Sequence, residues 1–291
     1  MNRIPESELI INPDGSIFHL HIKPGQLAST VILVGDPGRV ETVASFFQEI
    51  VHQGENREFV WRTGIFNNKE FTVLSTGIGT DNIDIVLNEL DAVVNVDFET
   101  RMPKTTHQSL EIVRIGTSGS LQADLPVDSW LLSVKAIGFD GLLNYYGNRN
   151  EVSDLDFEAA FIQHVAWKNC LPTPYTVNSS SELFEKLSGS KVTSGITISA
   201  PGFYGPQGRV VRLPLRMPKL NSSITSFRYG NARITNFEME CSAIYGLSAM
   251  LGHKAATVCV IIANRLAGTY SQDYKTVVKE LIEYVLTNLT K

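Results

Sequence analysis

The sequence predicts a single α/β domain, because β-branched, apolar runs alternate with segments of helical periodicity. The chain has 291 residues, of which 43% are hydrophobic, so it can bury a large core. No internal repeat, low-complexity tract or linker divides it. One domain spanning residues 1–291 is therefore preferred to two smaller ones.

Five apolar runs have the composition expected of buried strands. They are residues 30–35 (TVILVG), 71–76 (FTVLST), 111–116 (EIVRIG), 191–199 (KVTSGITIS) and 254–263 (KAATVCVIIA). Apolar residues three or four apart predict amphipathic helices over residues 40–47, 83–90 and 277–285. The polar stretch 91–109 is expected to be an irregular surface insertion ahead of the strand that carries Arg114.

A further strand, residues 232–238 (ARITNFE), runs directly into a helix over residues 244–251, which Gly252 ends. Glu238 and Glu240 lie at this turn. Ligands of α/β sheets bind at that edge, and side chains two residues apart on an extended backbone point the same way. Taken alone, the pair is better explained as acidic residues that complement the dipole at a helix N-terminus.

Composition argues against several classes of function. The formal charge of −5 and the lack of a basic run argue against a nucleic-acid partner. The apolar runs are far shorter than the roughly 20 residues that span a bilayer, and the N-terminus lacks a signal peptide's apolar core, so we expect a cytoplasmic protein without a membrane partner. Cys170, Cys241 and Cys259 are expected to be reduced and buried, and the six scattered His residues to form no metal cluster.

The turn GDPGR, residues 35–39, has the features of an anion site between a strand and a helix. Asp36 suits the helix N-cap, Pro37 suits the first helical position, and Gly35 lets a ligand approach the backbone. Free amides, the helix dipole and the guanidinium of Arg39 would together hold phosphate. An ordinary strand-to-helix turn with a surface arginine explains this motif equally well when it is taken alone.

A second strand end, RIGTSG at residues 114–119, offers a matching set of donors. Arg114 lies inside an apolar strand, where a guanidinium is costly to bury unless something negative meets it. The hydroxyls of Thr117 and Ser118 and the glycine amides add further donors. The two turns together indicate one shared phosphate.

The glycine-rich loop GFYGPQGR, residues 202–209, suits a flat ring with polar edges. Phe203 and Tyr204 offer faces for stacking, Gln207 presents a donor and an acceptor, and Arg209 presents a fork of donors. These groups match the carbonyl, N–H and carbonyl edge of a pyrimidine. If phosphate and base are bound at the three loops, the Glu238 and Glu240 pair is left for a sugar, because ionised carboxylates accept from vicinal hydroxyls.

The order of these motifs along the chain resembles the uridine phosphorylase family of the hexamer-forming nucleoside phosphorylase superfamily. The resemblance rests on FHL, GDPGRV, REF, STGIG, RIGTSGSLQ, FYGPQGR, FEME and IANR, between His19 and Arg265. It implies an α/β domain with a central mixed, partly barrel-like sheet flanked by helices. It also implies phosphorolysis of uridine to uracil and ribose 1-phosphate, in nucleoside catabolism and pyrimidine salvage.

Carried over position by position, the resemblance implies three subsites. The implied phosphate subsite consists of Gly35, Arg39, Arg114 and Thr117, with Arg57 of a neighbouring subunit. The implied ribose subsite consists of Thr117, Met239 and Glu240, with His19 of the neighbour. The implied base subsite consists of Phe203, Gln207, Arg209, Glu238 and Arg265. Catalysis is assigned to Arg39, Arg114, Thr117, Gln207, Arg209 and Glu240. The implied partner is a second copy of the chain, in a dimer or a hexamer built as a trimer of dimers.

One departure from the family concerns cofactors. Relatives tend to have TGIGGPS where this chain has TGIGTDN, which argues against a monovalent cation at the dimer contact near Glu58 and Ile78. We therefore expect no metal and no cofactor, with phosphate as a co-substrate.

Rival functions remain open from the sequence. The nearest rival is a purine nucleoside phosphorylase, but that class usually carries a proton-donating Asp near the position of Asn264. A hydrolytic nucleosidase would not need three arginines around an anion. A non-catalytic nucleoside-binding protein could share the fold. The sequence also leaves uridine undecided against thymidine or deoxyuridine.

Overall fold

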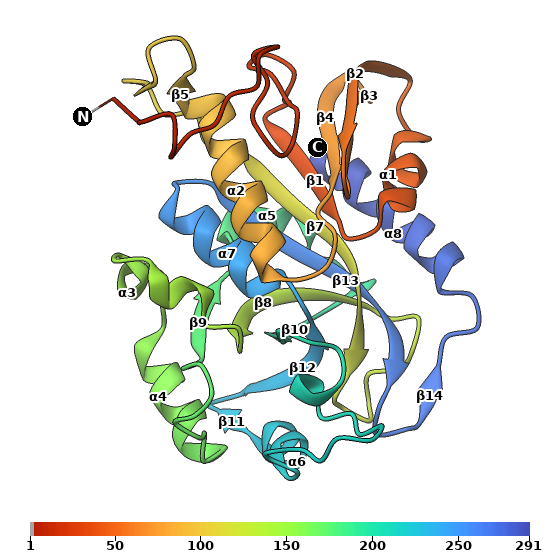
Figure 1. Cartoon of the computed structure of the whole chain (residues 1–291). Coiled ribbons are helices and arrows are strands. Elements are labelled where there is room, and N and C mark those ends of the chain that lie inside the picture. The colour runs from red at the N-terminus through yellow and green to blue at the C-terminus, as the bar shows by residue number, and fades with distance from the viewer. Residues whose placement is uncertain (1–2) are drawn as a thin grey trace.

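Twelve strands make up the central sheet of the computed structural model, which describes residues 3–291 (Figure 1). They are β1 (Thr30–Val34), β2 (Glu49–Asn56), β3 (Phe59–Phe66), β4 (Lys69–Ser75), β7 (Glu111–Ser120), β8 (Trp130–Gly138), β9 (Tyr175–Asn178), β10 (Val192–Ser199), β11 (Arg228–Tyr229), β12 (Ala232–Glu238), β13 (Lys254–Asn264) and β14 (Thr269–Tyr270). A separate hairpin pairs β5 (Val96–Asp97) with β6 (Met102–Pro103).

The helices are α1 (Pro37–Ala44), α2 (Thr80–Asn95), α3 (Arg149–Val152), α4 (Leu155–His164), α5 (Ser181–Leu187), α6 (Leu220–Ser226), α7 (Cys241–Met250) and α8 (Tyr274–Leu289), with short 3₁₀ turns at Leu142–Tyr145 and Gly205–Gln207. Among residues 3–291, none of these helices is long and apolar enough to cross a membrane.

Part of the sheet closes on itself. Strands β12, β10, β8, β13 and β7 follow one another, and β12 also pairs with β7, through Phe237 with Gly119 and Asn236 with Ser120. The remaining strands β1, β4, β3 and β2 extend the sheet from β7 as an open wing. Because the ring contains both parallel and antiparallel pairs, the expected mixed, partly barrel-like sheet is confirmed.

Both faces of the sheet are covered, which explains its continuous apolar runs. In β1 every residue is buried: Val31 and Leu33 pack in one core with α2 and α7, and Ile32 and Val34 pack in another with α1 and α8. Figure 1 shows α2 and α7 on one side of the sheet and α1 and α8 on the other. A third core beneath α4 and α6 lines the outer side of β10 and β12.

The predicted strands and helices are all present, with shifts of boundary. Strand β7 continues to Ser120, so Thr117 to Gly119 lie within the strand and not in a turn after it. The first helix ends at Ala44, so Phe46 and Phe47 pack from the following turn. Helix α2 continues to Asn95 and takes up the first residues of segment 91–109, which was expected to be irregular. Beyond it, the segment forms the β5–β6 hairpin and a coil that leads into β7.

Two expectations about cysteine and histidine need correction. Cys241 and Cys259 are buried as predicted, but Cys170 is exposed in a coil after α4. The structure also gathers side chains that are far apart in the sequence: donor atoms of Asp91, His107 and His253 lie within 4.8 Å of one another. Residues from separate elements can meet in this way without any local spacing signal.

Within this histidine cluster, the contacts of the His253 ring bear on whether it could bind a metal. The Leu110 amide donates to Nδ1 of His253 at 3.2 Å, so in the neutral ring the proton is on Nε2, 3.3 Å from the Asp91 carboxylate. A histidine that binds a metal through one ring nitrogen usually donates an N–H from the other nitrogen to an acceptor. In His253 that other nitrogen, Nδ1, accepts a hydrogen bond instead. The arrangement therefore argues against a metal on His253, whose Nε2 faces the Asp91 carboxylate but has no hydrogen-bond partner among residues 3–291.

Tyr245 in α7 ties two strands of the ring to the helix that follows the site. Its buried hydroxyl donates to the Ser133 carbonyl and accepts from the Thr257 amide, at 2.7 and 2.8 Å. We predict that Tyr245→Phe lowers the free energy of unfolding by about 1–3 kcal/mol, because both backbone groups lose this partner. Urea unfolding measures the change, with Tyr145→Phe, 89% exposed, as a control within about 0.5 kcal/mol of the parent. Equal stability of the two variants would contradict the assignment.

Candidate active site

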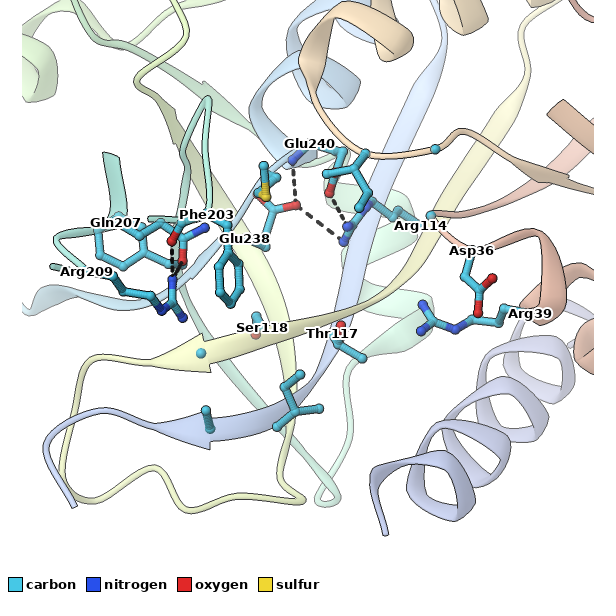
Figure 2. A pocket seen from close by; sticks show the side chains of 18 of the residues that line it. Asp36, Arg39, Arg114, Thr117, Ser118, Phe203, Gln207, Arg209, Glu238 and Glu240 are labelled. Atoms are coloured by element: carbon cyan, nitrogen blue, oxygen red, sulfur yellow. Dashed lines mark hydrogen bonds and ion pairs between the residues drawn. The ribbon is translucent and has the colours of Figure 1, made fainter. Parts of the chain in front are cut away.

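A cavity of about 800 Å³ lies where β1, β7 and β12 end or bend, beside the loop before α6. Of the residues predicted for the site, Gly35, Arg39, Arg114, Thr117, Phe203, Gln207, Arg209, Glu238, Met239 and Glu240 line it. Figure 2 shows them in a row, from Arg39 through Arg114 and the carboxylates to the Phe203 loop. Four segments far apart in the sequence thus form one elongated site.

The turn after β1 is built as the sequence predicts. The Asp36 carboxylate accepts from the Gly38 amide at 2.9 Å and caps α1, and Pro37 takes the first position. Gly35 lines the cavity, and a Cβ added there would meet the Gly77 carbonyl at 3.3 Å. The absence of a side chain therefore lets the two loops that flank the helix N-terminus lie against each other.

Arg39 presents a positive charge that the rest of the described chain leaves available. Its guanidinium donates only to the Ile115 carbonyl, at 3.3 Å, and no carboxylate of residues 3–291 lies within ion-pair distance. Burial and the neighbouring charge of Arg114 lower the pKa of Arg39. An anion bound between the two arginines would relieve both effects.

Arg114 is buried in the ring, and its charge is balanced from α7. Burial by itself would lower the pKa of Arg114, but the carboxylates of Glu240 and Glu238 outweigh it and raise that pKa. Nη2 is hydrogen-bonded to Glu240, and Nη1 lies 3.3 Å from Glu238 Oε2. Its Nε is buried and has no hydrogen-bond partner among residues 3–291, so one donor of the guanidinium is unsatisfied.

Gly116 makes the position of the guanidinium possible. Residues 114 and 116 point to the same face of β7, and a Cβ on Gly116 would lie 2.0 Å from Arg114 Nη1. The Arg114 side chain folds back over this gap. The sequence RIG therefore encodes both the arginine and the space that it occupies.

Glu238 and Glu240 confirm that a carboxylate pair sits at the start of α7, and they use their oxygens differently. Glu238 Oε2 accepts from the Glu240 and Cys241 amides at 2.9 Å, so it caps the helix, as the plainer interpretation of the motif predicts. Glu240 Oε1 accepts from the Gly79 amide at 2.8 Å, and its Oε2 meets Arg114. Burial raises the pKa of Glu238 against the opposing effect of Arg114.

The loop at residues 202–209 brings three predicted residues into contact. The Arg209 guanidinium stacks on Phe203 at 3.8 Å from the ring centroid, and Nη1 donates to Gln207 Oε1 at 2.5 Å. Arg265 is outside the cavity lining and holds the loop from behind by donating to the Gln207 and Gly208 carbonyls. Its predicted supporting role fits these contacts.

His19 and Arg57 do not line the cavity of their own chain, as the resemblance anticipates. His19 Nδ1 lies 2.6 Å from Glu89 of α2, and Arg57 is exposed at the tip of the β2–β3 hairpin with φ 54°. Asn56, the residue before Arg57, donates to the His19 carbonyl at 2.9 Å. His19 and the tip of the β2–β3 hairpin therefore lie on one surface.

The cavity also includes residues that the sequence analysis did not assign to a phosphate, ribose or base subsite. Ile262, Ala263 and Tyr270 form an apolar wall from β13 and β14, and Ile78, 70% exposed, lies at the mouth. Ser118, noted only as part of a motif, lines the cavity with a buried hydroxyl that has no partner within residues 3–291. For Ile262 and Ala263 the sequence gives no indication of a cavity, because apolar residues at a strand end look like core.

The arrangement divides the cavity chemically. One end holds two arginines and a helix N-terminus, suited to a doubly charged anion. The middle holds a carboxylate and Met239, suited to a polyhydroxylated ring, and the other end holds a stacking ring with a paired amide and guanidinium. A molecule with these three parts in this order would use every group.

Comparisons with known proteins show which family the chain belongs to. A family model described as Phosphorylase superfamily matches residues 29–289. The chain is 29% identical to the uridine phosphorylase of Thermococcus kodakarensis over 267 residues, 89% of this chain and 81% of the relative. It is 25% identical to the DeoD-type purine nucleoside phosphorylase of Bacillus subtilis over 276 residues, 94% of this chain and 99% of the relative.

A solved structure of similar fold is that of a Trypanosoma brucei nucleoside phosphorylase, described as showing uridine phosphorylase activity. It superimposes with a TM-score of 0.89 at 28% identity, covering 97% of this chain and 99% of that one. The similarity therefore extends over the whole α/β domain.

We predict that Arg39→Ala weakens the binding of inorganic phosphate roughly 10- to 100-fold, the range expected for a lost charge-assisted hydrogen bond. Calorimetric titration of the nucleoside-free protein measures it. Arg233→Ala is the control, because that arginine pairs with Asp124 and does not line the cavity. Equal affinities for the two variants would rule out an anion site at Arg39.

Proposed function

The chain belongs to the phosphorylase superfamily, and on that premise we propose that it cleaves pyrimidine nucleosides with phosphate, most efficiently uridine, to give uracil and ribose 1-phosphate. The observation that carries the proposal is the order of groups in the cavity, with arginines, a carboxylate and an amide–guanidinium pair in one row. The protein would thus be a pentosyltransferase of nucleoside catabolism and pyrimidine salvage in the cytoplasm.

The nucleophile in this reaction is phosphate, so the protein's first task is to hold it. The amides after Gly35, the guanidinium of Arg39, the free edge of Arg114 and the Thr117 hydroxyl surround one end of the cavity. Positioning an anion beside the sugar turns a bimolecular step into an effectively unimolecular one. No side chain then needs to form a covalent intermediate.

The ribose lies between the anion and the base in this proposal. Its hydroxyls donate to Glu240, and Met239 packs against the ring. As the bond from C1′ to the base nitrogen breaks, positive charge develops on the sugar, and the buried carboxylate stabilises it.

The base leaves with the electron pair of that bond, and its negative charge spreads onto two carbonyl oxygens. Arg209 and the Gln207 amide are placed to accept this charge, while Phe203 offers its face to the ring. Gln207 and Arg209 are hydrogen-bonded to each other. A ligand with complementary edges would replace this hydrogen bond with its own. A pyrimidine supplies such edges.

We propose further that active sites are shared between copies of the chain in a dimer or hexamer. His19 and Arg57 lie away from their own cavity, and His19 is hydrogen-bonded to Asn56, the residue before Arg57, so one surface could deliver an imidazole to a ribose and a guanidinium to a phosphate. The exposed apolar side chain of Ile78 at the cavity mouth supports a covering partner.

We also propose that this chain does without a cation at that contact. The side-chain amide of Asn82 donates to Glu58 Oε1 at 3.1 Å and to the Thr76 carbonyl at 2.8 Å. Two oxygens that could coordinate a cation are therefore already bonded to an internal donor.

The purine alternative is weakened by the position of Asn264. Its amide nitrogen donates to the Gln122 and Leu125 carbonyls, and its Oδ1 accepts from the Leu266 and Ala267 amides. The side chain is buried in these contacts and is no proton donor for a purine ring. A non-catalytic nucleoside-binding protein would release no uracil when phosphate is added, which separates it from the enzyme.

We predict that uridine is cleaved faster than inosine or adenosine by orders of magnitude, since a purine leaves Gln207 and Arg209 poorly paired. Arg209→Ala should lower kcat for uridine about a hundredfold or more, the usual effect of losing a donor to developing charge. Steady-state phosphorolysis measures both, with exposed Arg212→Ala as control. Inosine turnover equal to uridine turnover would overturn the base assignment.

We predict that Glu240→Gln impairs uridine more than 2′-deoxyuridine, because the deoxynucleoside has already lost one hydroxyl donor to the carboxylate. The amide keeps the shape of the side chain but removes its charge. The ratio of kcat/KM for the two substrates, measured at saturating phosphate, should fall about tenfold. An unchanged ratio would show that Glu240 does not hold the ribose hydroxyls.

A further inference from the structure

We propose that Ser199, at the end of β10, is a positioning residue for the phosphate site that acts on Arg114 through Glu238. This inference rests on the proposed function for the identity of the anion. Ser199 is fully buried, and the described lining of the cavity does not include it. Its influence on a ligand must therefore pass through a neighbouring side chain.

The direction of the Ser199 hydrogen bond is fixed by its surroundings. Its Oγ accepts from the Ser242 amide at 2.8 Å, which leaves the hydroxyl proton for Glu238 Oε1 at 2.5 Å. The bond thus runs from a neutral donor to a carboxylate. Such a bond favours the ionised form of the acid.

Glu238 is largely occupied by protein donors. Its Oε2 accepts from two backbone amides and faces Arg114, its Oε1 accepts from Ser199, and its side chain is 1% exposed. A carboxylate held from three directions has little capacity for a substrate donor. We therefore assign Glu238 the role of fixing Arg114 and the start of α7, in place of the base contact implied by the family resemblance.

The geometry explains what Glu238 does for the arginine. Glu238 and Glu240 bind the two Nη ends of Arg114, and this leaves Nε as the buried edge without a partner. If the Glu238 charge is lost, the Nη1 end loses its ion pair and keeps only the 3.4 Å hydrogen bond to Cys259 Sγ, so the orientation of the guanidinium is less firmly set. Phosphate binding should then weaken even though no group that contacts phosphate has changed.

Several charged and titratable groups face Glu238 from the packed elements. Arg114 comes from β7, Glu240 and Cys241 from the start of α7, Cys259 from β13 and Tyr175 from β9. Burial raises the pKa of Glu238, and the bonds from Arg114 and Ser199 oppose that rise. Removing the Ser199 hydroxyl therefore raises the pKa further, and acidification should cost phosphate affinity at a higher pH than in the parent protein.

The test is calorimetric titration of the nucleoside-free protein with inorganic phosphate between about pH 5 and 8. We expect Ser199→Ala to bind phosphate about tenfold more weakly at neutral pH, with its loss of affinity on acidification shifted to higher pH. Ser199→Thr, which keeps the hydroxyl, should restore both. In turnover assays of the same proteins, KM for phosphate should rise more than KM for uridine.

Ser133→Ala is the matched control. Ser133 is equally buried on the neighbouring strand β8, and its hydroxyl is paired with Thr197 instead of a site carboxylate. If Ser199→Ala and Ser133→Ala have the same phosphate affinity and pH profile, the proposal is wrong. Should Ser199→Ala not fold, Glu238→Gln tests the same link: it must weaken phosphate binding and remove the acidic dependence, and failure to do so overturns the proposal.

Phosphate binding and turnover are measured separately, so the two proposals can fail independently. A parent protein that binds phosphate but does not cleave uridine would refute the proposed function alone. The same serine effects on binding would still support the role of Ser199.

Discussion

The burial of one guanidinium inside a β-sheet is the constraint on which the rest of the site depends. Moving a charge from water into a protein interior costs several kcal/mol unless opposite charges and hydrogen bonds meet it. Arg114 meets that requirement with two carboxylates from the start of α7, with a glycine two residues along its own strand, and with the closure of β12 onto β7. Removing any one of these would leave the arginine unbalanced or misplaced.

The side chains assigned to the substrates are also hydrogen-bonded to one another. Arg114 pairs with Glu240 at one end, and Gln207 pairs with Arg209 at the other. Buried polar groups without partners are costly, so this internal pairing stabilises the ligand-free protein. A ligand gains affinity only where it replaces those bonds with equivalent ones, which makes the pairing a source of selectivity as well as stability.

The fold and most of the cavity could be predicted from the sequence because the relevant signals are local. Strand runs, the Asp36 cap, the arginine in an apolar strand and the order of motifs each follow from neighbouring residues. What the residues alone could not predict depends on contacts between distant segments: the ring closure, which only the resemblance implied, the meeting of His107 with His253 and Asp91, and the bond from Ser199 to Glu238. The resemblance supplied His19 and Arg57, for which the residues themselves indicated nothing.

The closed ring of strands has a consequence for how the protein acquires its site. The pairing of Asn236 with Ser120 joins residues more than a hundred positions apart, and forming so distant a contact carries a large loop-closure entropy and slows folding. This pairing brings β7, which carries Arg114, directly beside β12, which carries Glu238. During synthesis, β7 is complete long before β12 exists, so Arg114 emerges without its counter-charges. A nascent chain must therefore keep this arginine hydrated until nearly the entire domain has been made.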